Sequence, residues 1–292
     1  MIPAQFDYIA PKSLQEALSV LKNNKQDTKL LAGGHSLLPM MKLRLAQPEM
    51  LVDLRHIREL SYIRQKGNTI AIGAMTTYQQ IEQSEIIQRN LPVLSHTTSL
   101  IGDVQVRNRG TIGGAVAHAD PAADLPAVLL ALDAEFKLDN IKRHRLMASS
   151  RFFKDAFLTG LSENEILSEI SIPILLESTG ASYLKLPNLA SRFAIVGVAA
   201  VTSLGSDGLY SRVSIAITGA GPKPVRARTA ERYLIGKEPT DHNVLNAARR
   251  AARGIEFQDD YHASAEYREY TTRVFAERAL KESLEKAMRN IK

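Results

Sequence analysis

The chain contains no cysteine in its 292 residues, and this absence limits its fold and chemistry more than any other feature. Without cysteine there are no disulfides, no thiolate zinc sites, no iron–sulfur ligands and no cysteine nucleophile. The fold must therefore rest on its own hydrophobic cores, for which 45% apolar residues suffice, and disorder is excluded. Any redox chemistry on this chain must use an organic cofactor.

The charge pattern excludes one large class of partners. The 37 Lys and Arg residues exceed the 31 Asp and Glu residues, so the net charge is +6. A nucleic-acid interface would gather cations on one face, often among aromatic side chains. Here the basic runs, such as Arg249-Arg250, are short, and Trp is absent. We therefore expect no nucleic-acid partner.

Apolar stretches of the chain are short. Those around 125–132 and 193–201 fall well below the roughly 20 residues that a membrane span requires. The first residues also lack the basic and apolar regions of a signal peptide. The sequence predicts no membrane span and a cytoplasmic location.

Helices and strands alternate with short connections over the first 175 or so residues. Capping-box patterns at Ser13 to Glu16 and Thr77 to Gln80 predict helix starts. Periodicity and turn residues predict helices near 13–23, 77–88, 92–101 and 121–132, strands near 28–32, 50–54 and 69–74, and a turn or helix capped by Ser36. The glycine-punctuated segment 103–114 is expected to be irregular.

The remaining residues have a different pattern. A small polar break at 177–180 is the best candidate for a domain boundary. Segments 193–204 and 209–218 read as a β-hairpin around Gly205-Ser206-Asp207-Gly208. Helical patterns follow at 225–235 and 243–252 and in a long final helix from about 267 to 291. At about 100 to 200 residues per domain, the chain has room for two domains, and the second is α+β.

Two segments carry adjacent glycines: Ala32-Gly33-Gly34-His35-Ser36 and Thr111-Ile112-Gly113-Gly114-Ala115. Glycine pairs permit positive φ and expose successive backbone N–H groups, which allows close approach to a pyrophosphate. Neither segment is a G-x-G-x-x-G fingerprint or a P-loop. From spacing alone they could be structural turns or an anion site, and together they could clasp a dinucleotide from two sides.

Two other patterns suggest different chemistry. Gly34-His35-Ser36 follows an apolar strand like a serine hydrolase nucleophile elbow, but the final glycine is missing and only distant acids and histidines could complete a triad. His118-Ala119-Asp120 could ligate a metal, yet no second His stands at H-x-x-x-H spacing. Polar residues closing a loop before Pro121 are the simpler interpretation of that segment.

A family resemblance rests on several stretches in a fixed order. They are LAGGHSLLP at 31–39, QVRNRGTIGG at 105–114, HADPAAD at 118–124, GAGP at 219–222, VRAR at 225–228 and SAEYR at 264–268. In this order they resemble the medium, FAD-binding subunits of the molybdenum hydroxylases, such as those of carbon monoxide dehydrogenase and quinoline oxidoreductase and the FAD domain of xanthine dehydrogenase. The resemblance covers nearly the whole chain.

This resemblance implies an α+β fold in two domains. Residues 1–176 would form a two-part FAD-binding domain of the PCMH or VAO type, with subdomains of about 1–56 and 57–176, and residues 177–292 the flavoprotein C-terminal domain. FAD would place its pyrophosphate on Ala32 to Ser36 and Thr111 to Ala115, with its flavin ring toward the C-terminal domain. Asp124, Ile172 and Lys185 match further FAD-contacting positions. No side chain is assigned as catalyst or metal ligand.

The chain departs from the family pattern at a few positions. Ala115 stands where the family often has Asn or Ser, which removes a side-chain hydrogen bond, and Asp103 replaces a usual His. Asn188-Leu189 replaces a basic pair, and Arg192 stands in place of an Asp before the aromatic Phe193. These departures concern the surroundings of the flavin.

The implied function is that of one subunit in a larger enzyme. A large subunit would hold the molybdenum cofactor, and a small subunit would hold two [2Fe-2S] clusters, in agreement with the absence of cysteine here. FAD on this chain would pass electrons from the clusters to an external acceptor. Because Cys is absent and nothing marks His35 as an attachment point, the flavin is expected to be bound without a covalent link. A dimer of heterotrimers is expected. The alternatives are a self-sufficient FAD oxidoreductase of the same superfamily and a scaffold without flavin.

Overall fold

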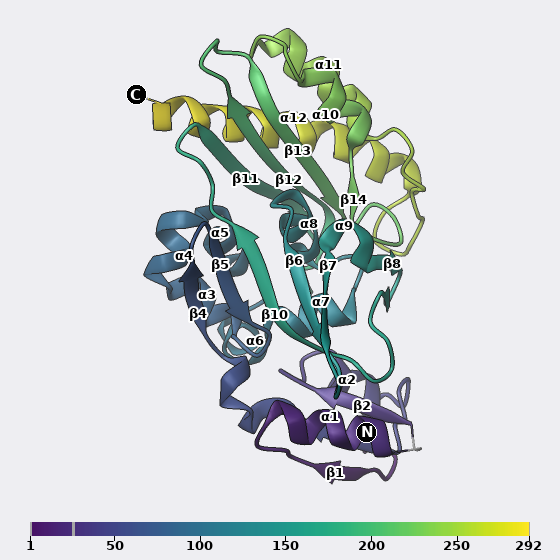
Figure 1. The fold of residues 1–292 in the computed structure, drawn as a ribbon. Helices are drawn as coiled ribbons and strands as arrows, with labels where there is room; N and C mark the ends of the chain where they lie inside the picture. Colours follow the sequence, from purple (N-terminus) through teal and green to yellow (C-terminus); the bar gives the residue numbers. More distant parts are fainter. Residues whose placement is uncertain (1, 25–26, 292) are drawn as a thin grey trace.

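The computed structural model describes residues 2–24 and 27–291. Within these residues the chain forms sheets of three, five and four strands and a short two-stranded ribbon. The larger sheets follow one another from the bottom to the top of Figure 1. None of the helices in this part of the chain is long and apolar enough to cross a membrane.

The three-stranded sheet comes from the N-terminal residues and is parallel, in the order β1-β3-β2. Its elements are β1 (Asp7–Ile9), α1 (Leu14–Asn23), β2 (Thr28–Leu31), α2 (Leu37–Lys42) and β3 (Met50–Asp53). Helix α1 begins where Ser13 accepts a hydrogen bond from the Glu16 N–H, and its apolar face is buried. Strand β2 leads directly into the first glycine segment, so this small sheet positions that segment.

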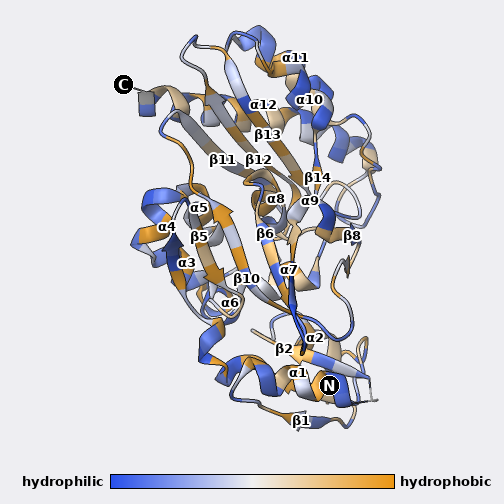
Figure 2. Ribbon diagram, viewed as in Figure 1, coloured by the Kyte–Doolittle hydropathy of each residue, from blue (hydrophilic) through white to orange (hydrophobic). Residues whose placement is uncertain are grey.

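The five-stranded sheet is antiparallel, in the order β4-β5-β10-β6-β7. Its strands are β4 (Ile63–Lys66), β5 (Thr69–Gly73), β6 (Glu135–Asp139), β7 (His144–Ala148) and β10 (Ile166–Pro173). The 3-10 helices η1 (Leu54–His56) and η2 (Arg58–Leu60) lead into it, and α9 (Ser149–Phe152) with the ribbon β8 (Phe153–Asp155) and β9 (Leu158–Thr159) follows β7. Central β10 is mostly apolar (Figure 2), as a strand inside a core must be.

Six helices lie between β5 and β6 in the sequence. They are α3 (Tyr78–Gln83), α4 (Glu85–Asn90), α5 (Pro92–Ser99), α6 (Val104–Arg109), α7 (Ile112–His118) and α8 (Asp124–Ala131). Every residue of α8 is buried, because this helix packs between helices α5 and α7 on one side and strands β12 and β13 of the next sheet on the other. A helix that is apolar on all sides is stable only in such an interior position.

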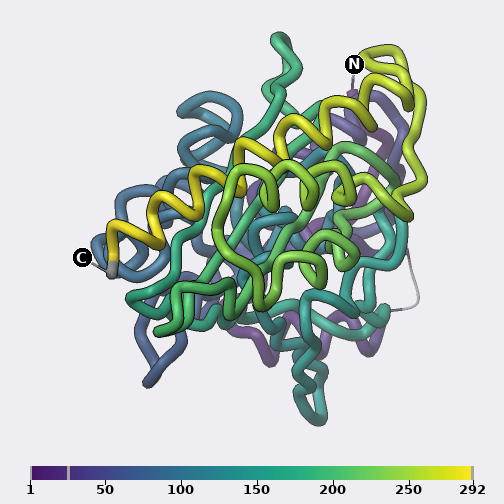
Figure 3. The backbone as a smooth tube through the Cα atoms, turned by 90° about the horizontal axis from the view of Figure 1, so that it is seen from above, coloured from purple at the N-terminus to yellow at the C-terminus, as the bar shows by residue number. Residues whose placement is uncertain are grey.

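The four-stranded sheet β11-β12-β13-β14 is antiparallel. It consists of β11 (Thr179–Pro187), β12 (Ala194–Leu204), β13 (Tyr210–Thr218) and β14 (Val225–Arg226). Its helices are α10 (Arg228–Leu234), α11 (Asp241–Ala251) and α12 (Ala265–Ile291). Seen from above, α12 runs across this sheet (Figure 3), and it packs on β11 and β12. The hairpin and the long final helix expected from the sequence are confirmed.

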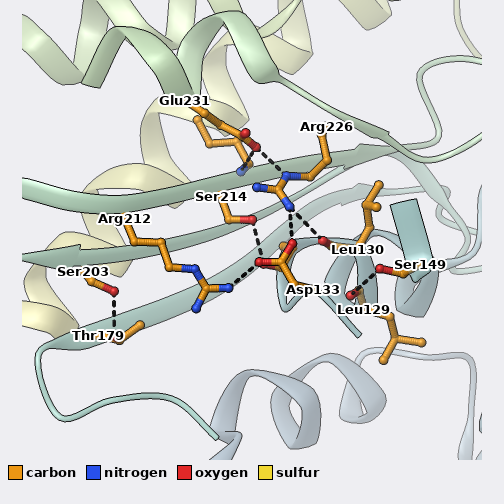
Figure 4. A network of polar contacts seen from close by, with 12 residues as sticks. Leu129, Leu130, Asp133, Ser149, Thr179, Ser203, Arg212, Ser214, Arg226 and Glu231 are labelled. Atoms are coloured by element: carbon orange, nitrogen blue, oxygen red, sulfur yellow. Dashed lines mark hydrogen bonds and ion pairs between the residues drawn. The ribbon is translucent and has the colours of Figure 1, made fainter. Parts of the chain in front are cut away.

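A polar network joins the top sheet to the segment that follows α8 (Figure 4). The Asp133 carboxylate accepts hydrogen bonds from Arg212 on β13 at 2.5 Å and from Arg226 on β14 at 2.7 Å. Arg226 also contacts Glu231 of α10, and the Ser214 hydroxyl donates to the Ala131 carbonyl. The middle and upper sheets are therefore connected through α8 by charged contacts as well as by apolar packing.

Two expectations about local structure are wrong. Segment 103–114 is not irregular: Asp103 caps α6 by accepting from the Val106 N–H at 2.9 Å, and Thr111 caps α7 by accepting from the Gly114 N–H at 3.1 Å. These N-caps outweigh the weak helix propensity of the glycines. The predicted helix 77–88 is interrupted, because Ser84 is extended and caps the start of α4.

Candidate functional site

A cavity of about 410 Å³ lies between the two glycine segments. Its volume falls within the range of about 300 to 1,000 Å³ that is typical of small-molecule sites. The whole of Ala32 to Ser36 lines it, as do Thr111 and Gly113 to Ala115. The tertiary structure thus brings together two segments that lie more than seventy residues apart in the chain, as expected for a shared ligand site.

The first glycine segment offers free backbone donors. Within residues 2–24 and 27–291, the N–H groups of 33–36 have no hydrogen-bond acceptor. Gly34 adopts φ +77°, a conformation that favours glycine and turns the chain from β2 into α2. Successive free N–H groups around such a turn form a concave anion-binding surface.

The second glycine segment uses its backbone donors internally. The N–H groups of Ile112 and Gly113 donate to the carbonyls of Thr76 and Ala74, at 3.0 and 2.9 Å. Those of Gly114 and Ala115 donate to the side chain and carbonyl of Thr111. The expectation that both segments expose N–H groups is therefore wrong for this one, which begins a helix and must satisfy the donors of its first turn.

Glycine is required at these segments for two different reasons. A Cβ atom on Gly33 would overlap the backbone of Arg109, and one on Gly113 would overlap the backbone of Ala74. These two glycines allow the segments to pack tightly. Gly114 differs, because its Cβ would meet only the Thr111 hydroxyl, at 2.8 Å, and the Ala32 methyl group, at 3.5 Å. Gly114 therefore keeps space open between the two segments.

The charges around the cavity favour an anion. Lys29 and the imidazoles of His35 and His118 line it, and none of its described lining residues is Asp or Glu. The Nδ1 of His35 lies 3.0 Å from the Gly33 carbonyl, so this nitrogen donates. Burial lowers the pKa of His118 below its usual value of 6.5, although the nearby Asp120 carboxylate acts in the opposite direction.

Asp124 and Lys185 lie outside the cavity lining and pair with each other. The Lys185 Nζ donates to the Asp124 carboxylate at 2.9 Å, and both side chains are only 5% exposed. It also donates to the carbonyls of Leu100 and Arg192, while the Tyr183 hydroxyl donates to Asp124 at 2.5 Å. Burial raises the pKa of Asp124, and the Lys185 ammonium counteracts this shift.

Ile112 and Ile172 are the other predicted site residues outside the cavity lining. Both are fully buried in the large core of the middle sheet, and Ile172 pairs with Ile70 across β10 and β5. In the described structure they are core residues. Contact of FAD with Asp124, Ile172 and Lys185 stays a prediction.

Several lining residues were not singled out from the sequence. Tyr78 lies at the start of α3, and Phe157 sits in the turn of the ribbon with its ring 5.0 Å from that of His118. Apolar side chains such as Met75 and Leu161 complete the wall. These residues come from two stretches of the chain, 75–78 and 157–161, and a single sequence contains no signal that predicts their convergence. His118 also lines the cavity, and the sequence did single it out as part of the HADPAAD stretch.

The serine hydrolase alternative finds no support in this geometry. Ser36 precedes α2, and its side chain makes no capping bond, contrary to our expectation. Within the described ranges, no histidine or carboxylate lies within hydrogen-bond distance of its hydroxyl. A nucleophile needs a base within about 2.6 to 3.2 Å. Ser36 is instead placed to offer a polar hydroxyl beside the free N–H groups.

Comparison with known proteins agrees with this arrangement. A family described as "FAD binding domain in molybdopterin dehydrogenase" matches residues 4–175, and "CO dehydrogenase flavoprotein C-terminal domain" matches residues 181–283. The medium chain of carbon monoxide dehydrogenase from Hydrogenophaga pseudoflava is 42% identical over 96% of this chain and 97% of its own length. The glyceraldehyde dehydrogenase medium chain of Sulfolobus acidocaldarius is 37% identical over 97% and 99%.

Solved structures show the same likeness. A carbon monoxide dehydrogenase structure from Hydrogenophaga pseudoflava matches with a TM-score of 0.95 and 43% identity, covering 98% of this chain and 99% of that one. Quinoline 2-oxidoreductase from Pseudomonas putida matches with a TM-score of 0.93 and 30% identity, covering 99% and 100%. Sequence, fold and cavity agree, and the chain belongs to the medium, FAD-binding subunits of the molybdenum hydroxylase family, which are oxidoreductase subunits.

Proposed function

We propose that this chain is the electron-transfer subunit of a heterotrimeric molybdenum hydroxylase. In this proposal it receives electrons from [2Fe-2S] clusters of a small subunit and delivers them through FAD to an external acceptor. A large subunit with the molybdenum cofactor oxidises the substrate, and two heterotrimers associate. The cavity between the glycine segments, with free N–H groups and no carboxylate among its described lining residues, is the observation that carries the proposal.

The residues of the cavity fit an FAD dinucleotide. The free N–H groups of 33–36 would bind the diphosphate, with the hydroxyls of Ser36 and Thr111 nearby. Gly114 and Ala115 would shape the opposite wall without side-chain donors. Lys29, whose side chain is 56% exposed and 3.8 Å from Asp27, would supply positive charge. Bound FAD supplies the redox chemistry, which side chains of a cysteine-free chain do not.

The remaining predicted contacts lie toward the C-terminal sheet. Lys185 lies on β11, and its side chain pairs with Asp124 on α8. The pair therefore lies at the junction between the proposed domains, 1–176 and 177–292. We propose that the flavin ring lies toward this junction. The pair would orient the cofactor and hold the 188–192 turn, since Lys185 donates to the Arg192 carbonyl. We also propose that the complex is cytoplasmic.

Rapid-mixing spectroscopy of the assembled complex tests the electron path. After removal of FAD, substrate should still reduce the iron–sulfur clusters, whereas transfer to the acceptor should be lost and should return when FAD is added. Failure of cluster reduction with an intact molybdenum site would place FAD upstream and contradict the proposal. Activity of the isolated chain with a small substrate would instead favour a self-sufficient FAD oxidoreductase.

A further inference from the structure

The two walls of the cavity differ in what they offer an anion. The first segment presents the free N–H groups of 33–36, but the second uses all four N–H groups of 112–115 within the protein. A diphosphate has oxygens on both sides and is bound best when donors surround it. On the side of the second segment, a donor must therefore come from a side chain.

Tyr78 stands on that side of the cavity. Its N–H donates to the Gly110 carbonyl at 3.0 Å, and its ring packs so closely on Gly110 that a Cβ there would collide with it. The preceding Thr77 pairs with Thr111 as an isolated bridge, and the Thr77–Gln80 capping box secures the start of α3. The side chain is thus fixed against the second glycine segment before any ligand binds.

The Tyr78 hydroxyl differs from those of the two other largely buried tyrosines. Tyr183 donates its hydroxyl to Asp124. Tyr210 has a fully enclosed hydroxyl without a partner, in the core of the C-terminal domain. The Tyr78 side chain is only 9% exposed and lines the cavity, and its hydroxyl has no hydrogen-bond partner within residues 2–24 and 27–291. Unlike the enclosed Tyr210 hydroxyl, it remains accessible and is therefore free to bond to a ligand or to water.

We propose that the Tyr78 hydroxyl donates a hydrogen bond to the diphosphate of the bound dinucleotide, opposite the free N–H groups of 33–36. This inference rests on the proposed function and assigns a further binding residue to the same site. Burial, together with the negative charge of Asp124, raises the pKa of Tyr78, so the hydroxyl keeps its proton and remains a donor. Tyr78 binds the cofactor and takes no part in electron transfer.

Tyr78→Phe removes the hydroxyl and keeps the ring. In the full chain freed of flavin, thermal unfolding of this variant should match that of the wild type, because no protein partner is lost. Its dissociation constant for FAD, measured by flavin fluorescence, should rise about tenfold, as expected for a lost hydrogen bond to a charged group. ADP, which carries the diphosphate without the flavin, should show a similar loss when it competes with FAD.

Two tyrosine variants serve as matched controls. Tyr210→Phe removes an enclosed, unpaired hydroxyl outside the cavity lining, so it should not lower stability and should leave FAD affinity unchanged. Tyr183→Phe removes one of the two side-chain partners of Asp124, so the flavin-free chain should be less stable. Unchanged FAD affinity in Tyr78→Phe would overturn the inference, and so would weaker FAD binding with unchanged ADP binding, since the hydroxyl would then contact the flavin half. Absence of FAD binding by the wild type would instead contradict the proposed function.

Discussion

At the scale of single residues, the four glycines of the two segments have different structural roles. Gly33 and Gly113 are needed because the chain packs too closely for a side chain, and Gly34 because of its positive φ. A Cβ on Gly114 would meet the Thr111 hydroxyl and the Ala32 methyl group but no backbone outside its own helix. The sequence does not distinguish the four glycines, because a glycine pair that packs against the protein reads the same as one that faces a ligand.

A valine at Gly114 should separate binding from folding. We expect Gly114→Val to fold, with a loss of about 1 to 2 kcal/mol, because the Thr111 hydroxyl that caps α7 must move. Its side chain would occupy the cavity, so FAD affinity should fall at least about tenfold. Urea denaturation and FAD titration measure the two effects.

The matched control is Gly113→Val. Its side chain would collide with the Ala74 backbone, so this variant should lose about 3 kcal/mol or more of stability. Normal FAD affinity in Gly114→Val would show that this glycine does not face the cofactor. Gly34→Val is a poorer test, because a valine at φ +77° is strained whether or not FAD binds.

At the scale of elements, helix α8 connects the cavity region to the C-terminal sheet. All its residues are buried, and all but the first, Asp124, are apolar. Asp124 pairs with Lys185, and just beyond the end of α8 Asp133 pairs with Arg212 and Arg226. These charged contacts at its two ends add to the apolar packing that fixes the position of the helix.

Asp133→Asn tests the connection at the C-terminal end of α8. Asn tolerates the observed φ of 55° but lacks the charge, so both ion pairs are weakened without backbone strain. Asp133 is half exposed, and we expect a loss of about 1 to 2 kcal/mol in the free energy of unfolding, measured with urea.

An exposed helical ion pair provides the control for Asp133. Arg289 and Glu285 lie 3.8 Å apart, and their side chains are 78% and 67% exposed. Arg289→Gln should leave stability unchanged within about 0.5 kcal/mol. If Asp133→Asn and Arg289→Gln lost the same free energy of unfolding relative to the wild type, Asp133 would contribute no more than an ordinary surface charge.

At the scale of the whole molecule, the chain has a cavity suited to a cofactor, and within residues 2–24 and 27–291 no three potential metal ligands cluster together. The cavity lies where the N-terminal segment 32–36 meets the middle sheet and α7, so FAD would bridge the two parts of the proposed FAD-binding domain. Binding should therefore favour the folded arrangement of both parts by mass action.

We expect one FAD per chain, bound without a covalent link. The chain has no cysteine, and the His35 Nδ1 already donates to the Gly33 carbonyl. Native mass spectrometry of the assembled complex should find one FAD for each copy of this chain, and acid or heat should release it unchanged. Flavin that remains with the denatured polypeptide, or a complex without flavin, would contradict this prediction.

Much of the fold can be predicted from the sequence. The helix start at Ser13, the capping box at Thr77, the hairpin around 205–208 and the long final helix depend on local patterns, and the structure confirms them. At Ser13 only half of the predicted capping box forms, because the Glu16 carboxylate accepts from the Lys12 N–H. The helices at 104–109 and 112–118 were missed, because single N-caps at Asp103 and Thr111 are weaker signals than the glycines around them. Family resemblance, carried by motifs in order, identified the cofactor.

The sequence alone determined that any redox chemistry here needs an organic cofactor, because it contains no cysteine, and that two glycine segments are candidates to hold it. Only the tertiary structure decided which groups face the cavity. It assigns the free N–H groups to one segment, uses those of the other to begin a helix, and places Tyr78 beside the second. The physical reason is that a backbone donor is available to a ligand only when packing leaves it without a protein acceptor, and packing depends on residues distant in the chain.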